Sequence, residues 1–77
     1  MMGIENMICI EIKTAAYSHN KNFNAIHGAL LDAGYKSNIR LGGKFADQGS
    51  AVMIFTDAPL EMIDGLSFTR SAVQIRA

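Results

Sequence analysis

The spacing of the apolar residues changes several times along this chain, and each change limits the secondary structure that a segment can form. In residues 6–14, an isoleucine at every second position gives the period of a β-strand with one buried face. The isoleucines of this face are Ile8, Ile10 and Ile12. The segment is therefore predicted to be the first strand.

A helical period follows. Between residues 20 and 33 the apolar positions fall three and four apart, which lines one face of a helix. Asn20 is a suitable N-cap, and Gly34 is a suitable left-handed stop after which Tyr35 can fold back on the last turn. Gly28 weakens helix propensity, so we expect it where the helix passes close to a sheet. The apolar face consists of Phe23, Ile26, Leu30 and Ala33.

Three further strands and a short helix are predicted beyond residue 35. In residues 36–41, two different faces alternate, one with Ser37, Ile39 and Leu41 and the other with charged and amide side chains. Residues 50–56 are apolar on both faces, as in a central strand or a strand whose second face meets a partner. The other elements are a bend at Gly42 and Gly43, a hairpin turn at 46–49, a short helix opened by Asp57 and Pro59 and ended by Gly65, and a last strand at 71–76 with Val73 and Ile75 inward.

The resulting order of elements is β-α-β-β-α-β. It predicts one domain over residues 1–77, an α+β sandwich of the ferredoxin-like kind, with a four-stranded antiparallel sheet, strand order 4-1-3-2 and a short second helix. That order makes the first and third strands inner strands, and these are the most apolar. The predicted edge strands carry charges that discourage foreign pairing, namely Lys36, Arg40 and Arg76.

The composition contains more apolar residues than such a small chain can bury. Of its 77 residues, 49% are hydrophobic and 18% are charged, against about 25% charged in average domains. A chain of this size buries only about 60% of the surface that its unfolded form exposes. We therefore expect an exposed apolar patch that meets a partner, a ligand or a second copy.

Cysteine content and hydropathy indicate the compartment. Cys9 is the only cysteine, so no internal disulfide can form. No apolar run approaches the length of a membrane span, and Glu5, Asn6 and Glu11 interrupt the region where a secretory signal needs an apolar run. A cytoplasmic protein without membrane contact is expected.

The charges balance, at seven acids and seven bases, but they are segregated. Most bases lie in residues 13–44, whereas residues 45–64 contain acids and no base. In the predicted fold the helix-free face of the sheet carries Glu11 and several bases, and the acids surround the second helix. Such a bipolar surface orients a partner. The bases expected on this face are Lys13, Lys36, Arg40 and Arg76.

The same face is expected to show Met7 and Cys9. It also shows either Met53 with Phe55 or Val52 with Ile54, depending on the phase of the third strand. Flexible apolar side chains beside cations suit a protein interface, so the predicted partner is a protein with an acidic surface or a second copy in a homodimer. The candidate partner-binding residues are Lys36, Arg40 and Lys44 along the second strand and hairpin, Phe45 at its tip, and Met7 and Phe55 on the open face.

Residues suited to catalysis or metal binding are sparse. Cys9, His19 and His27 show no metal-ligand spacing, and Cys9 between isoleucines is expected to be a small packed side chain. Gly42, Gly43 and Lys44 lack the rest of a phosphate-binding loop. The sequence therefore predicts no enzyme, no metal and no cofactor.

Two resemblances provide alternatives. Residues 48–55 resemble the longer signature of RNA-recognition domains at Gly49, Ala51 and Phe55, although Ser50 and Val52 occupy the positions of the stacking aromatics. This resemblance implies RNA or DNA binding on the sheet. At Ala25, Ile26, Leu30, Ala33, Gly34 and Tyr35, the first helix and its exit resemble those of ACT-type regulatory domains. This second resemblance implies a dimer that binds an amino acid near the start of the first helix.

The function favoured by the sequence is a small non-enzymatic protein-binding module. It would act as an inhibitor or adaptor by occupying the surface of its partner. The length of the chain is similar to that of anti-host proteins of phages and mobile elements, of which anti-CRISPR proteins are one class.

Overall fold

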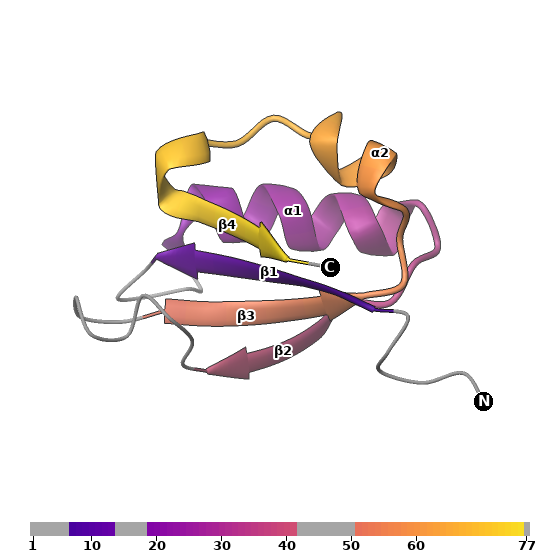
Figure 1. Ribbon diagram of the computed structural model, residues 1–77, viewed down its shortest axis with the longest axis horizontal. Coiled ribbons are helices and arrows are strands. Elements are labelled where there is room, and N and C mark those ends of the chain that lie inside the picture. Colours follow the sequence, from indigo (N-terminus) through magenta and orange to yellow (C-terminus); the bar gives the residue numbers. More distant parts are fainter. Residues whose placement is uncertain (1–6, 14–18, 42–50, 77) are drawn as a thin grey trace.

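The computed structural model describes residues 7–13, 19–41 and 51–76 of the chain. Both helices lie on one side of a twisted sheet (Figure 1). In chain order the elements are β1 (Ile8–Lys13), α1 (Lys21–Asp32), β2 (Asn38–Leu41), β3 (Ala51–Thr56), α2 (Leu60–Asp64), a 3-10 turn (Arg70–Ala72) and β4 (Val73–Arg76).

The four described strands form one antiparallel sheet in the order β2-β3-β1-β4. Read from the opposite edge, the order is β4-β1-β3-β2. The inner strands are thus β1 and β3, and β2 and β4 form the edges. A mixed α/β architecture with a four-stranded antiparallel sheet and two helices, as predicted from the sequence, is confirmed.

The register fixes which side chains face the helices. Residues paired directly across antiparallel strands share one face, and one such row runs across the sheet through Ile39, Ile54, Ile10 and Ile75. The register also shows which side chains of β3 face the helices: Val52 and Ile54 lie on the helix side of the sheet, and Met53 and Phe55 lie on the opposite side. The buried core is completed by Phe23, Ile26 and Leu30 of α1 and by Ile63 of α2.

Helix α1 begins and ends as its sequence predicts. Oδ1 of Asn20 accepts a hydrogen bond from the backbone N–H of Phe23 (3.0 Å). At the other end Gly34 adopts φ 88°, and the N–H groups of Gly34 and Tyr35 donate to the carbonyls of Leu31 and Leu30. These two bonds form a Schellman motif, which satisfies the last carbonyls of the helix. Tyr35 then packs against the core.

The expectation that Gly28 marks a close approach to the sheet is wrong. A side chain placed at Gly28 would meet nothing within 4 Å, because this residue lies on the exposed side of α1. The spacing of the apolar positions defines the buried face of the helix, and Gly28 is outside that face.

This placement predicts opposite effects of alanine at two glycines. We expect Gly28→Ala to raise the free energy of unfolding by about 0.5–1 kcal/mol, because alanine has the higher helix propensity and space is available. Gly34→Ala should lower it by about 1 kcal/mol, because φ is positive there. Urea denaturation of both variants measures the two changes, and a Gly28→Ala variant less stable than the parent would contradict the assignment.

Short polar contacts fix the connections around α2. The hydroxyl of Thr56 is buried and accepts from the N–H of Ala58 (3.1 Å). Oδ1 of Asp57 accepts from the N–H of Lys36 (2.9 Å), which joins the start of the α2 connection to the segment before β2. Helix α2 ends at Gly65, as predicted.

Edge strand β2 is much more exposed than expected for a strand with an inward face. All four of its residues are exposed, and Ile39 and Leu41 retain 37% and 72% of their accessible surface although they lie on the helix side. Leu31 on α1 is also 54% exposed. The apolar excess of the composition therefore appears in part at this edge.

Candidate interaction face

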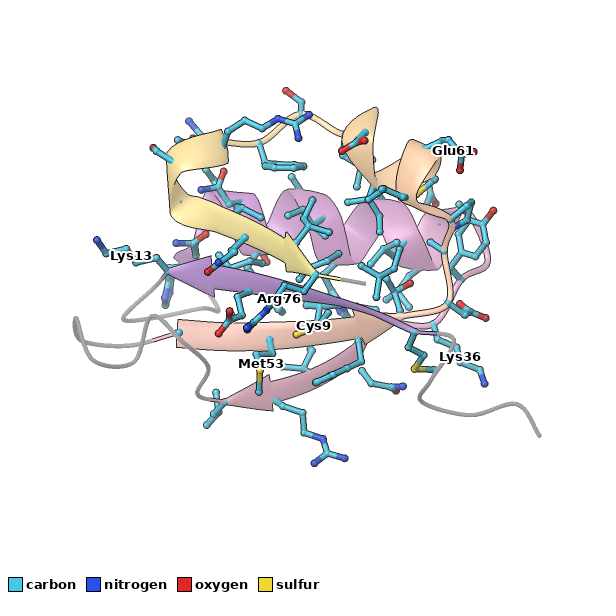
Figure 2. The ribbon with its side chains drawn as sticks, viewed as in Figure 1. Cys9, Lys13, Lys36, Met53, Glu61 and Arg76 are labelled. Carbon is cyan, nitrogen blue, oxygen red and sulfur yellow. The ribbon has the colours of Figure 1, made fainter. Side chains whose placement is uncertain are left out.

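The side of the sheet opposite the helices is here called the open face. Two rows of paired residues cross it from β4 to β2. Lys13 and Ala51 form a further pair at one end. Figure 2 shows Cys9, Met53 and Arg76 over the middle of the sheet. The rows are Arg76, Cys9, Phe55 and Asn38, and then Gln74, Glu11, Met53 and Arg40.

The centre of the open face is mainly apolar around one buried carboxylate, that of Glu11, and its β2 edge is polar. Ala51 is buried, and Cys9, Met53 and Phe55 are half-buried. At the β2 edge, Asn38 and Arg40 are exposed. An apolar centre with a polar rim is the usual arrangement of a protein interface, and arginine is enriched there.

An ion pair lies within this face. Glu11 is fully buried, and its Oε1 accepts a hydrogen bond from the guanidinium of Arg76, whose side chain is 39% exposed. Arg76 lies on the open face, as predicted, but its charge is directed to Glu11 and not to solvent alone. Arg40 remains the exposed arginine at the β2 edge.

Cys9 lies beside this ion pair. Burial raises the pKa of the Cys9 thiol above its ordinary value, the charge of Arg76 lowers it, and the charge of Glu11 raises it. A thiol with a raised pKa holds little thiolate at neutral pH, and the thiolate is the nucleophile. This arrangement supports a packed rather than a reactive role for Cys9.

The raised pKa predicts how stability depends on pH. Above about pH 8.5 the unfolded chain ionises Cys9 while the folded chain keeps the proton, so the free energy of unfolding falls as the pH rises. Cys9→Ala should remove this part of the alkaline dependence. Urea denaturation of both proteins between neutral and alkaline pH measures it, and identical pH profiles would contradict the prediction.

The structure brings together some of the predicted partner-binding residues and separates others. Arg40 and Phe55 both lie on the open face, in adjacent strands. Lys36 precedes β2, so its expected position on the sheet is wrong; the hydrogen bond to Asp57 fixes it in the connection. Met7 immediately precedes β1 and is half-buried. Lys44 and Phe45, with the predicted bend and hairpin turn at 42–49, lie outside the described residues.

The acids gather around α2, as expected from the charge pattern. Asp57, Glu61 and Asp64 are exposed, and Figure 2 shows Glu61 on α2, away from Lys13 at the end of β1. Asp64 pairs with Arg70 (3.5 Å), whose guanidinium also lies 4.7 Å from the ring centre of Phe68.

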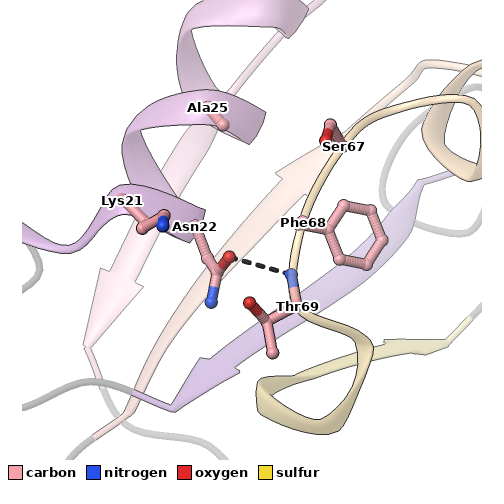
Figure 3. Close-up of a pocket in the computed structure, with 6 residues that line it drawn as sticks. All are labelled: Lys21, Asn22, Ala25, Ser67, Phe68 and Thr69. Atoms are coloured by element: carbon pink, nitrogen blue, oxygen red, sulfur yellow. Dashed lines mark hydrogen bonds between the residues drawn. The ribbon is translucent and has the colours of Figure 1, made fainter.

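A pocket of about 540 Å³ lies at the start of α1 (Figure 3). The N–H of Thr69 donates to Oδ1 of the buried Asn22 (3.0 Å), which attaches the segment before β4 to the helix. The sequence contained no signal for this link beyond the polar residue inside a helix. The pocket is lined by Lys21, Asn22, Ala25, Ser67, Phe68 and Thr69.

His27 also has a defined environment that the sequence did not indicate. Its ring stacks on Phe23 with centroids 5.1 Å apart, and Nδ1 shares a hydrogen bond with the hydroxyl of Ser37 (2.6 Å). Phe23 and His27 are four residues apart, which places their side chains on the same face of α1. Together these contacts hold the side of α1 against the segment that leads into β2.

The phase of β3 bears on the resemblance to RNA-recognition domains. Val52 occupies one of the two positions of the stacking aromatics in that signature, yet it is fully buried on the helix side. This position cannot form a stacking surface on the open face. Ser50, the other such position, lies outside the described residues.

The described residues contain no group of three or more histidine, cysteine, aspartate or glutamate side chains placed to hold a metal ion. Within the same parts of the chain, neither helix has the length and apolar character needed to cross a membrane.

Together, these elements define a small mixed α/β module whose helix-free sheet face has a mainly apolar centre, the Glu11–Arg76 ion pair and an exposed arginine at the β2 edge. Comparison of the chain with protein-family models, with curated proteins and with solved structures found no match.

Proposed function

We propose that this chain is a non-enzymatic module that binds an acidic segment of another protein and thereby acts as an inhibitor or adaptor. We also propose that its topology is ferredoxin-like. The strand order read from β4 and the shared core of α1 and α2 support that topology.

The observation that carries the functional proposal is the position of Arg40. It is exposed on edge strand β2, and Met53 is its direct partner on β3, next to half-buried Phe55. An arginine beside partly buried apolar groups can pair with a carboxylate of a partner while the apolar groups lose water. No acidic side chain of β2 competes for it, because Asn38–Leu41 contains none.

A protein partner is favoured over a nucleic acid. Affinity for nucleic acid depends mainly on neutralising phosphates, which requires an excess of basic residues. The chain has a formal net charge of zero, and Arg76 on the open face is paired with Glu11. A role against host proteins, as in anti-CRISPR-like inhibitors, is one form that such protein binding can take.

Reversing the charge of Arg40 tests the proposal. We expect Arg40→Glu to lower the affinity for the partner by about tenfold or more, because an ion pair is lost and a repulsion is introduced, while the fold is retained. Arg70→Glu changes the net charge equally at a distant exposed site and should leave the affinity within about twofold.

The measurement is affinity capture from host-cell lysate with the parent and both variants, followed by titration of the captured protein. Equal affinity of the parent and Arg40→Glu for that protein would contradict the proposal. A solution mass of twice 8.4 kDa for the isolated chain, lost in Arg40→Glu, would identify a second copy as the partner instead.

A second candidate function is binding of an amino acid, as the ACT-type resemblance implies. The pocket at the start of α1 favours it, since Lys21 and the hydroxyls of Ser67 and Thr69 line that pocket. Free amino acids that shift the amide resonances of the pocket residues, and not those of β2, would support this candidate.

A further inference from the structure

We propose that the partner binds by adding a β-strand to the outer edge of β2, and that this strand alternates acidic and apolar residues. This inference rests on the proposed function and specifies how the partner is held. It follows from the exposure of the edge, from the difference between its two sides and from its charge.

The outer edge of β2 is unpaired within the described part of the chain. Among the described residues β2 pairs only with β3, so no described strand lies along the other side of its backbone. All four residues of β2 are exposed, whereas β4, at the other edge, has three of its four residues half-buried. An exposed edge without proline offers N–H and C=O groups to an extended peptide.

The two sides of this edge differ in chemistry. On the helix side, Ile39 and Leu41 are exposed apolar residues, and Leu31 of α1 is also exposed. On the open-face side the edge carries Arg40.

These sides determine the sequence pattern of the added strand. Successive side chains of a strand point to opposite faces, so a strand beside β2 places alternate residues next to Leu41 and next to Arg40. Apolar residues suit the first position and carboxylates the second. A second copy fits less well, because pairing of two β2 strands that sets Ile39 against Leu41 also sets Arg40 against Arg40.

A synthetic peptide of alternating Glu and Val tests the inference with the full chain. We expect it to shift the amide resonances of residues 38–41 and to slow their hydrogen exchange. The same peptide methylated at every backbone nitrogen keeps the side chains but donates no hydrogen bond, so it should bind at least about tenfold more weakly.

Three variants complete the test. The Arg40→Glu variant should bind a Lys-Val peptide more tightly than the Glu-Val peptide. The Leu41→Asp variant should bind the Glu-Val peptide more weakly than the parent does. Leu60→Asp, a matched change at an exposed leucine of α2, should leave the affinity for the Glu-Val peptide unchanged.

Strand addition is overturned if the Glu-Val peptide leaves residues 38–41 unchanged, or if the methylated peptide binds equally well. Shifts confined to Cys9, Met53 and Phe55 would also overturn it, while leaving the proposed protein binding on the open face in place. Loss of partner capture in Arg40→Glu, as described above, is a separate readout, so failure of one proposal can be distinguished from failure of the other.

Discussion

Replacing Ile54 with alanine is expected to lower the free energy of unfolding by about 3–4 kcal/mol. Ile54 is fully buried, and on the helix side of the sheet it is flanked by Ile10 and Ile39 in the row of four isoleucines. Alanine removes buried apolar atoms and leaves a cavity that the sheet on one side and α1 on the other cannot easily close. A domain of this size has a total stability of about 4–11 kcal/mol, so the change removes a large part of it.

Ile39→Ala is the matched control. It makes the same chemical change in the same row, but at a residue that is 37% exposed on the edge strand. Its cost should stay below about 1.5 kcal/mol, because part of the side chain already contacts water. Urea denaturation of the two variants measures the difference, and equal costs would show that Ile54 does not lie at the centre of the core.

Removing Arg76 should have the second large effect. We expect Arg76→Met to lower the free energy of unfolding by about 2–3 kcal/mol, because the fully buried carboxylate of Glu11 then loses its arginine. The estimate is below the full cost of breaking a buried ion pair, since the Arg76 side chain is partly exposed.

Two comparisons distinguish this effect from a general loss of packing. The double change of Glu11→Leu with Arg76→Met should be more stable than Arg76→Met alone, since no buried charge remains. Arg70→Met removes the exposed pair with Asp64 and should cost less than about 1 kcal/mol. Thermal and urea denaturation of the three variants measure these changes, and equal losses for Arg70→Met and Arg76→Met would contradict the role of burial.

The elements of the fold were predictable because their signals are local. Alternation of the isoleucines identified β1, and the apolar spacing with Asn20 and Gly34 identified α1 and both of its ends. The ends of the strands were less predictable, because a strand ends where its hydrogen bonds to the neighbouring strand end. Thus Lys36 continues the alternation of β2 in sequence, but its N–H is bonded to Asp57 outside the sheet.

The candidate site was predictable in part. Alternation places Arg40 and Phe55 on one face once the phase of β3 is known, but the doubly apolar sequence of β3 left that phase open. The pairing of Glu11 with Arg76 had only a weak signal, namely one acid among several bases expected on the same face. Their burial and contact depend on side chains brought together from residues 65 positions apart, which no local pattern reports.

The position of β1 also affects how the chain folds. It is the first of the described strands and lies inside the sheet, yet its partners β3 and β4 come from the second half of the chain. Closing such long loops slows folding, so helix α1 can form before the centre of the sheet is assembled. Until then both edges of β1 are unpaired and its isoleucines are open to water. Misassociation between chains is therefore expected during this period, before the native sheet has formed.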